Sequence, residues 1–108
     1  MHHTLDIDVT VQPDRAVVTV AGELDTTTCP HVTAATDAIV LHGRTLILDL
    51  SGVSFMDSSA LNMLLALRQR TCAEDGALEL WGLHDQALRL LDLTATRSAF
   101  VLRTGLAR

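Results

Sequence analysis

Residues 48–61 read LDLSGVSFMDSSAL, and this segment decides the fold of the chain. It begins in a nearly unbroken apolar run over 46–50, which predicts a short central strand covered on both faces. Asp57 and Ser58 then supply good N-caps for a helix that we expect over 58–73. A buried strand that leads into a helix is typical of open α/β sheets, which expose functional groups at such junctions.

The sequence on either side of this segment predicts four further strands and two further helices. Apolar and polar residues alternate from Leu5 to Val11, and Pro13-Asp14 makes a turn into a second strand, so the chain begins with a hairpin. The expected strands are 5–11, 16–21, 46–50, 77–83 and 99–102, and the expected helices are 25–43, 58–73 and 84–94. This order, β-β-α-β-α-β-α-β, predicts an α/β fold: a mixed β-sheet with an N-terminal β-hairpin, with helices packed on it and right-handed crossovers.

Length and composition indicate one compact domain over residues 1–108. Hydrophobic residues make up 48% of the chain and aromatic residues only 3%, so its core must be aliphatic. The formal net charge of −5 disfavours nucleic acid and anionic membranes as partners. No apolar run approaches the ~18 residues that span a bilayer, and no signal peptide is recognisable. Because Cys29 and Cys72 read as free thiols, we expect a cytoplasmic protein.

No pattern in the sequence predicts an enzyme, a cofactor or a metal site. The chain contains no GxSxG elbow, no phosphate-binding GxxxxGK[ST] or GxGxxG loop, and no metal-ligand spacing of histidine or cysteine. Glu23, Asp25, Asp49 and Asp57 are carboxylates near strand ends, where capping of turns and helices is their commoner role. An α/β enzyme that uses Asp25 and Asp57 is the alternative, and Asp57→Asn would then abolish turnover.

Ser58 can serve in two ways at the start of its helix. As a cap it would contribute about 1 kcal/mol to stability. As a phosphoserine it would place a phosphate against free backbone N–H groups and the positive end of the helix dipole, which can hold the group without unfolding the domain. The chemistry of the residue alone does not choose between the two roles.

Two separated motifs resemble a known family. Gly22-Glu23-Leu24-Asp25, at the end of the second strand, and the segment 49–61 look like the STAS domain of bacterial anti-sigma factor antagonists. The resemblance covers nearly the whole chain in order and spacing, and it continues through the helix that carries Ala87-Leu88-Arg89-Leu90-Leu91. Ala60 stands where many members carry glycine, and the chain is too short after its last strand for the further helix that members often have.

The resemblance implies a regulatory switch and no catalysis. Members of this family bind a small ATP-dependent serine kinase that otherwise sequesters a sigma factor, so the unphosphorylated antagonist frees the sigma factor. The kinase inactivates the antagonist by phosphorylating the first serine after the motif's aspartate, which is Ser58 here, and a phosphatase restores it. The ATP belongs to the kinase, so the chain needs no cofactor of its own. Asp25 would help to dock the kinase.

The expected partner-binding surface surrounds this serine. Its predicted residues are Asp25, Met56, Asp57, Ser58, Ser59 and Met63. Met63 is included in this surface because the helix over 58–73 is apolar around nearly its whole circumference. We expect Met63 or Leu67 to face solvent or a partner, unless neighbouring helices cover them. Ser58 and Ser59 flank the same helix start, and both remain candidates for modification.

A rival function comes from another class of protein. A similar STAS domain serves as a non-catalytic subunit of ABC-type lipid transport complexes. Binding to a membrane protein, in place of a soluble kinase, would distinguish this function from that of an antagonist. The missing C-terminal helix leaves one flank of the sheet barer than usual, so the sequence leaves monomer and homodimer both open.

Overall fold

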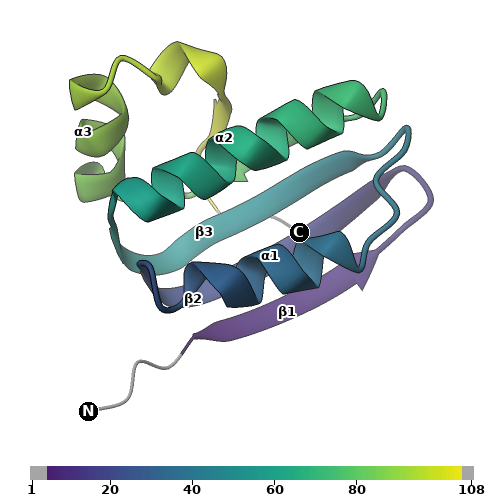
Figure 1. Ribbon diagram of the computed structural model, residues 1–108, viewed down its shortest axis with the longest axis horizontal. Coiled ribbons are helices and arrows are strands. Elements are labelled where there is room, and N and C mark those ends of the chain that lie inside the picture. The colour runs from purple at the N-terminus through teal and green to yellow at the C-terminus, as the bar shows by residue number, and fades with distance from the viewer. Residues whose placement is uncertain (1–4, 106–108) are drawn as a thin grey trace.

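The computed structural model describes residues 5–105, which form one five-stranded sheet with three α-helices and a short 3-10 helix (Figure 1). In chain order the elements are β1 (Asp6–Val11), β2 (Arg15–Leu24), α1 (Cys29–Asp37), β3 (Thr45–Met56), α2 (Ser58–Ala73), β4 (Ala77–Trp81), α3 (Asp85–Leu93), η1 (Arg97–Ala99) and β5 (Val101–Arg103). The predicted α/β class and element order are confirmed, and α2 has the predicted bounds.

The sheet has the strand order β1-β2-β3-β4-β5. β1 and β2 form the predicted antiparallel hairpin, and all later neighbours are parallel. The pairing of β2 with β3 shifts register twice on the way to their carboxyl ends, where Leu24 lies opposite Met56. At the first shift the strands approach so closely that a Cβ on Gly52 would lie 2.9 Å from the Cβ of Ala21, and this approach therefore requires glycine.

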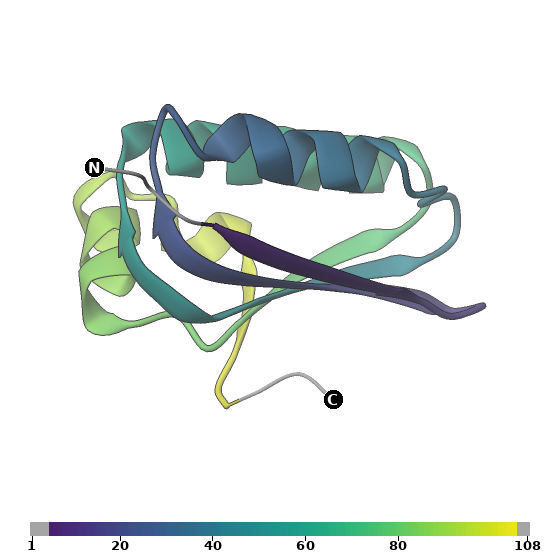
Figure 2. The ribbon, with the colours of Figure 1, turned by 90° about the horizontal axis from the view of Figure 1, so that it is seen from below.

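Both α1 and α2 cover the same face of the sheet, as the view along the sheet shows (Figure 2). The alternating residues of β2 and β3 that point to this face are fully buried, which forms an aliphatic core. Its larger fully buried members are Val18, Val20, Leu24, Val32, Leu41, Leu46, Leu48, Leu50, Met56, Leu64, Leu80 and Leu91. Ile47 and Asp49 point to the other face and are also buried, so both faces of β3 are covered as predicted.

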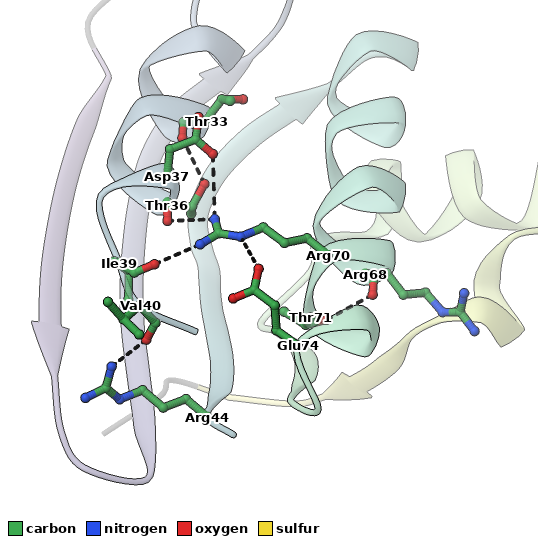
Figure 3. A network of polar contacts seen from close by, with 10 residues as sticks. All are labelled: Thr33, Thr36, Asp37, Ile39, Val40, Arg44, Arg68, Arg70, Thr71 and Glu74. Atoms are coloured by element: carbon green, nitrogen blue, oxygen red, sulfur yellow. Dashed lines mark hydrogen bonds and ion pairs between the residues drawn. The ribbon is translucent and has the colours of Figure 1, made fainter. Parts of the chain in front are cut away.

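Arg70 of α2 joins the two covering helices (Figure 3). Its guanidinium donates to the carbonyl oxygens of Thr36 at 2.9 Å and Ile39 at 2.8 Å, and to the Glu74 carboxylate at 2.9 Å. The last carbonyls of a helix lack partners within the helix, so a cation at this place satisfies them. The contact fixes the end of α1 against the last turns of α2.

Several predicted boundaries are wrong, among them the end of β2, which extends to Leu24, and the end of β4, which stops at Trp81. The helix expected over 25–43 is shorter, because Asp25 and Thr28 build a turn before α1 and the chain leaves the helix at Ala38. The strand expected over 46–50 extends to Met56, because its polar second half pairs with the end of β2. The last strand begins later than residue 99, because a 3-10 turn precedes it.

Candidate functional site

The start of α2 lies beside the carboxyl end of β2. The Asp57 backbone N–H donates to the Leu24 carbonyl at 3.2 Å, which ties the two strand ends together. Asp57 is the N-cap of α2 in an extended conformation, and its Oδ1 accepts from the backbone N–H of Ser59 at 2.9 Å and of Ala60 at 3.2 Å. Ser58 is therefore the first residue of the helix and lies at this edge of the sheet.

Ser58 and Ser59 occupy different environments. Ser58 is exposed, and its hydroxyl has no hydrogen-bond partner within the part of the chain that the structure describes. Ser59 is half-buried, and its hydroxyl donates to the Asp57 carboxylate and is hydrogen-bonded to the Cys29 thiol. Burial raises the pKa of that thiol, and the neighbouring Asp57 and Asp25 carboxylates raise it further, so Cys29 stays neutral.

Asp25 reaches the same edge from the turn between β2 and α1. Its Oδ1 accepts from the backbone N–H groups of Thr27 at 2.9 Å and Thr28 at 3.0 Å. The buried Thr28 hydroxyl donates to the Glu23 carbonyl at 2.7 Å, which closes the turn. Asp25 and Asp57 both act electrostatically on Cys29, so the structure brings the two predicted carboxylates to one edge. Each of them is engaged in holding the start of a helix.

Two residues that the sequence interpretation missed also belong to this edge. Gln86, in the first turn of α3, pairs with the backbone of Met56 in both directions: Oε1 accepts from the Met56 N–H at 2.9 Å, and Nε2 donates to the Met56 carbonyl at 2.8 Å. Phe55 precedes this residue and has 43% of its surface exposed. Strand alternation with the apolar Met56 is the signal that could have placed Phe55 outward, whereas nothing local indicates the contact of Gln86.

Two residues predicted to contact a partner are buried in the structure. Met56 is 1% exposed and Met63 is 9% exposed, so neither offers its side chain to a partner, and Leu67 is buried as well. The reason is that α2 packs against the sheet on one side and against α1 on another, so more than a single stripe of its surface is covered. The alternative that neighbouring elements cover these residues is the correct one.

The expectation for a phosphate at this helix start also changes. Asp57 already occupies the N–H groups of Ser59 and Ala60, and the Leu61 N–H bonds to the Asp57 carbonyl. A phosphate on Ser58 would therefore find few free donors on α2 and would stand beside a carboxylate. Such a group would extend into solvent, where its charge acts on an approaching partner.

Two hollows lie near this edge. One, with a volume of about 480 Å³, lies between α1 and Ser59. The other, of about 770 Å³, lies between the start of α3 and the end of β5. Within residues 5–105, no three histidine, cysteine, aspartate or glutamate side chains gather so that they could hold a metal ion. In the same range, no helix is long and apolar enough to cross a membrane.

Residues 6–106 match the family model of the STAS domain, and the match includes the whole site described above. The chain belongs to the STAS domain family. Among characterised members, this STAS domain is 35% identical over 82 residues to the anti-sigma-B factor antagonist of Listeria monocytogenes, covering 75% of this chain and 72% of the relative. It is 27% identical over 93 residues to the antagonist of the same name from Bacillus subtilis, covering 86% and 85%.

Solved structures show the same fold. An anti-sigma factor antagonist from Mycobacterium paratuberculosis superimposes with a TM-score of 0.80 at 29% identity, covering 93% of this STAS domain and 86% of that chain. The unphosphorylated form of SpoIIAA superimposes with a TM-score of 0.76 at 19% identity, covering 94% and 88%. A sulfate transporter family protein from Wolinella succinogenes also has this fold, with a TM-score of 0.74 at 15% identity, covering 87% and 80%. The fold alone therefore does not separate regulators from transporters.

Proposed function

We propose that this STAS domain is an anti-sigma factor antagonist that is switched by phosphorylation of Ser58. In the unphosphorylated state it binds an ATP-binding serine kinase that otherwise holds a sigma factor, and the sigma factor is released. The observation that carries the proposal is the exposed, unbonded Ser58 hydroxyl at the first residue of α2, beside the capping carboxylate of Asp57. The names of the relatives from Listeria and Bacillus support the same function.

Ser58 is a better phosphoryl acceptor than Ser59 on geometric grounds. A kinase must bring the γ-phosphorus of ATP in line with the serine oxygen, so the hydroxyl has to be accessible and free to turn. Ser58 meets both conditions, whereas Ser59 is half-buried and engaged with Asp57 and Cys29. In the transfer, Ser58 Oγ bonds to the γ-phosphorus of ATP, and the bond between that phosphorus and the leaving ADP breaks. The proton of the serine hydroxyl passes to a base of the kinase.

The phosphate then acts by charge. It adds about −1.5 to −2 charges at neutral pH to a chain whose formal charge is already −5. Because the first N–H groups of α2 are occupied by Asp57, the new charge is not absorbed by the helix and stands next to Asp57 and Asp25. Burying it against the kinase would cost desolvation and repulsion, so the complex dissociates while the fold stays the same. A phosphatase that removes the group restores binding.

The test is a binding titration with the kinase in its ADP-bound form. The kinase is first recovered with the wild-type chain from its own cells, identified by mass spectrometry and purified. We expect wild type, Ser58→Ala and Ser59→Ala to bind it, Ser58→Asp to bind at least about tenfold more weakly, and all four to unfold at nearly the same temperature. Incubation with ATP should phosphorylate wild type and Ser59→Ala and leave Ser58→Ala unmodified. Modification of Ser58→Ala, or equal binding by Ser58→Asp, would contradict the assignment.

The fold shared with a transporter family protein raises one alternative function, which the same recovery of bound proteins from cells would reveal. If wild type and Ser58→Asp both bring down membrane transport subunits and no kinase, the chain is a structural STAS subunit, and Ser58 acts only as the first residue of α2. The fold shared with the Wolinella protein is the observation behind this alternative.

A further inference from the structure

A groove runs along α1 and reaches Ser59, the residue after the proposed switch serine Ser58. Its volume is about 480 Å³. The residues that line it are Thr26, Cys29, Pro30, Thr33, Ala34, Asp37 and Ser59. Five of them form a single face of α1 at the spacing of successive helical turns, and Ser59 adds the first turn of α2. The groove therefore lies along one face of α1, beside the first turn of α2.

The groove is apolar along its length and acidic at the end near Ser59. Pro30 and Ala34 expose their side chains on its wall, and the neutral thiol of Cys29 lies in its floor. Asp37, at the end toward the C-terminus of α1, is already paired with the Arg70 guanidinium at 3.6 Å. The carboxylates of Asp57 and Asp25 lie near the other end. An occupant that fits this pattern has an apolar side chain flanked by a cation. The small side chains on α1 leave the space unfilled by the chain itself.

Side-chain interactions of Ser59 join the groove floor to the cap of α2, which lies beside Ser58. The Ser59 hydroxyl connects the Asp57 carboxylate, which caps α2 beside Ser58, with the Cys29 thiol in the groove floor. A protein that places its active site over Ser58 therefore meets the groove as part of one continuous surface. The groove is so open that a small molecule bound in it would stay largely exposed to water. A side chain of a partner protein would be covered by the rest of that protein's surface.

We propose that this groove receives an apolar side chain of the same serine kinase, with a basic residue next to it facing Asp57. The proposal rests on the function proposed above and extends it, because it gives the kinase a contact that phosphorylation does not touch. The groove would then set which kinase the chain accepts, while Ser58 sets when it is released.

The test uses the purified ADP-bound kinase and substitutions on α1. Thr33→Arg places a long cationic side chain over the groove, which blocks the space and repels a basic residue of the kinase. Ala34→Leu fills the space without a charge. His31→Arg is the matched control, because His31 is exposed on α1 and does not line the groove. We expect Thr33→Arg and Ala34→Leu each to weaken binding at least about tenfold, and His31→Arg to bind within about twofold of wild type.

Thermal unfolding of each variant shows whether weaker binding results from a loss of the folded state. The proposal is judged on the groove variant that retains the unfolding temperature of wild type. If both groove variants bind like wild type while Ser58→Asp does not, the groove proposal is overturned and the switch stands. If the kinase does not bind wild type at all, the proposed function fails and the groove proposal falls with it.

Discussion

Ser58 and Ser59 are adjacent in sequence, but their hydroxyl groups lie in different environments. Ser59 is a structural residue, because its hydroxyl links the helix cap to the buried Cys29. Ser58, one position earlier, turns its hydroxyl to solvent. The difference follows from helix geometry, because consecutive residues point about 100° apart, so only one of the two can face the neighbouring helix. Modification of Ser59 would break the link, whereas modification of Ser58 leaves the cap in place.

Phe55 is the residue at this edge whose exposure most calls for a partner. The chain has only two phenylalanines and one tryptophan, and this one is 43% exposed two residues before the capping Asp57. Exposed aromatic residues are enriched among the strongest contacts of protein interfaces. We expect Phe55→Ala to weaken binding of the kinase by about tenfold or more, and to change the unfolding temperature little because the ring is not in the core.

The matched control for Phe55 is Val11→Ala. Val11 is 49% exposed, but it pairs with Ala16 at the start of β2, whereas Phe55 pairs with Glu23 at the other end of that strand. Titration of both variants with the ADP-bound kinase checks the prediction. Equal affinities of the two variants would show that the ring lies outside the interface.

At the scale of elements, the switch edge is assembled from the ends of β2 and β3 and the starts of α1, α2 and α3. Carboxylates hold two of the helix starts, Asp25 before α1 and Asp57 before α2. Gln86, in the first turn of α3, is hydrogen-bonded to the backbone of Met56. The Gln86 contact positions the last residue of β3, and through it the cap of α2. The presentation of Ser58 therefore depends on an element that follows it by nearly thirty residues.

We expect Gln86→Ala to loosen this edge. Loss of the two bonds to Met56 should reduce the free energy of unfolding by about 1–2 kcal/mol, and should speed hydrogen exchange of the Met56 amide more than that of the core amides of β3. Gln69→Ala is the control, because Gln69 is exposed on α2. Urea unfolding and amide exchange measure the two effects. Unchanged protection of the Met56 amide would rule out the positioning role.

At the scale of the whole molecule, the site lies where parallel strands end, and the opposite ends of the helices supply stability. Open α/β sheets place their functional groups at the carboxyl ends of strands, and this chain follows that rule. The Arg70 cluster lies at the far ends of α1 and α2 and holds the two helices together (Figure 3). The proposed site and the Arg70 cluster therefore lie at opposite ends of the same pair of helices.

This separation predicts that Arg70→Met destabilises the fold without changing the switch. Removal of the guanidinium takes one donor from the Ile39 carbonyl and one from the Thr36 carbonyl, which keeps the Ile39 N–H at 3.1 Å. We expect a loss of about 2–3 kcal/mol in the free energy of unfolding. Arg68→Met, at an exposed position on the same helix, should cost less than about 0.5 kcal/mol. Below its unfolding temperature the Arg70→Met protein should bind the kinase like wild type. A large loss of affinity in the folded variant would contradict the separation.

The order of the elements, the hairpin and the bounds of α2 followed from the sequence alone, because they depend on short-range causes. Apolar alternation in β1, the strand before Asp57 and the cap at Asp57 itself all act within a few residues. The N-cap role of Asp57 was predicted from the same local segment and is confirmed, whereas the role of Ser58 stays a prediction.

Only the tertiary structure decided which residues at the site are accessible. Met56 and Met63 are buried because α2 is covered from two sides, and Ser58 differs from Ser59 because α1 brings Cys29 beside the latter. Gln86 meets Met56 across thirty residues of chain, and the groove is built by two helices that no sequence pattern pairs. Side-chain burial and contact depend on how elements pack against one another, and the periodicity of a single element carries no information about its neighbours.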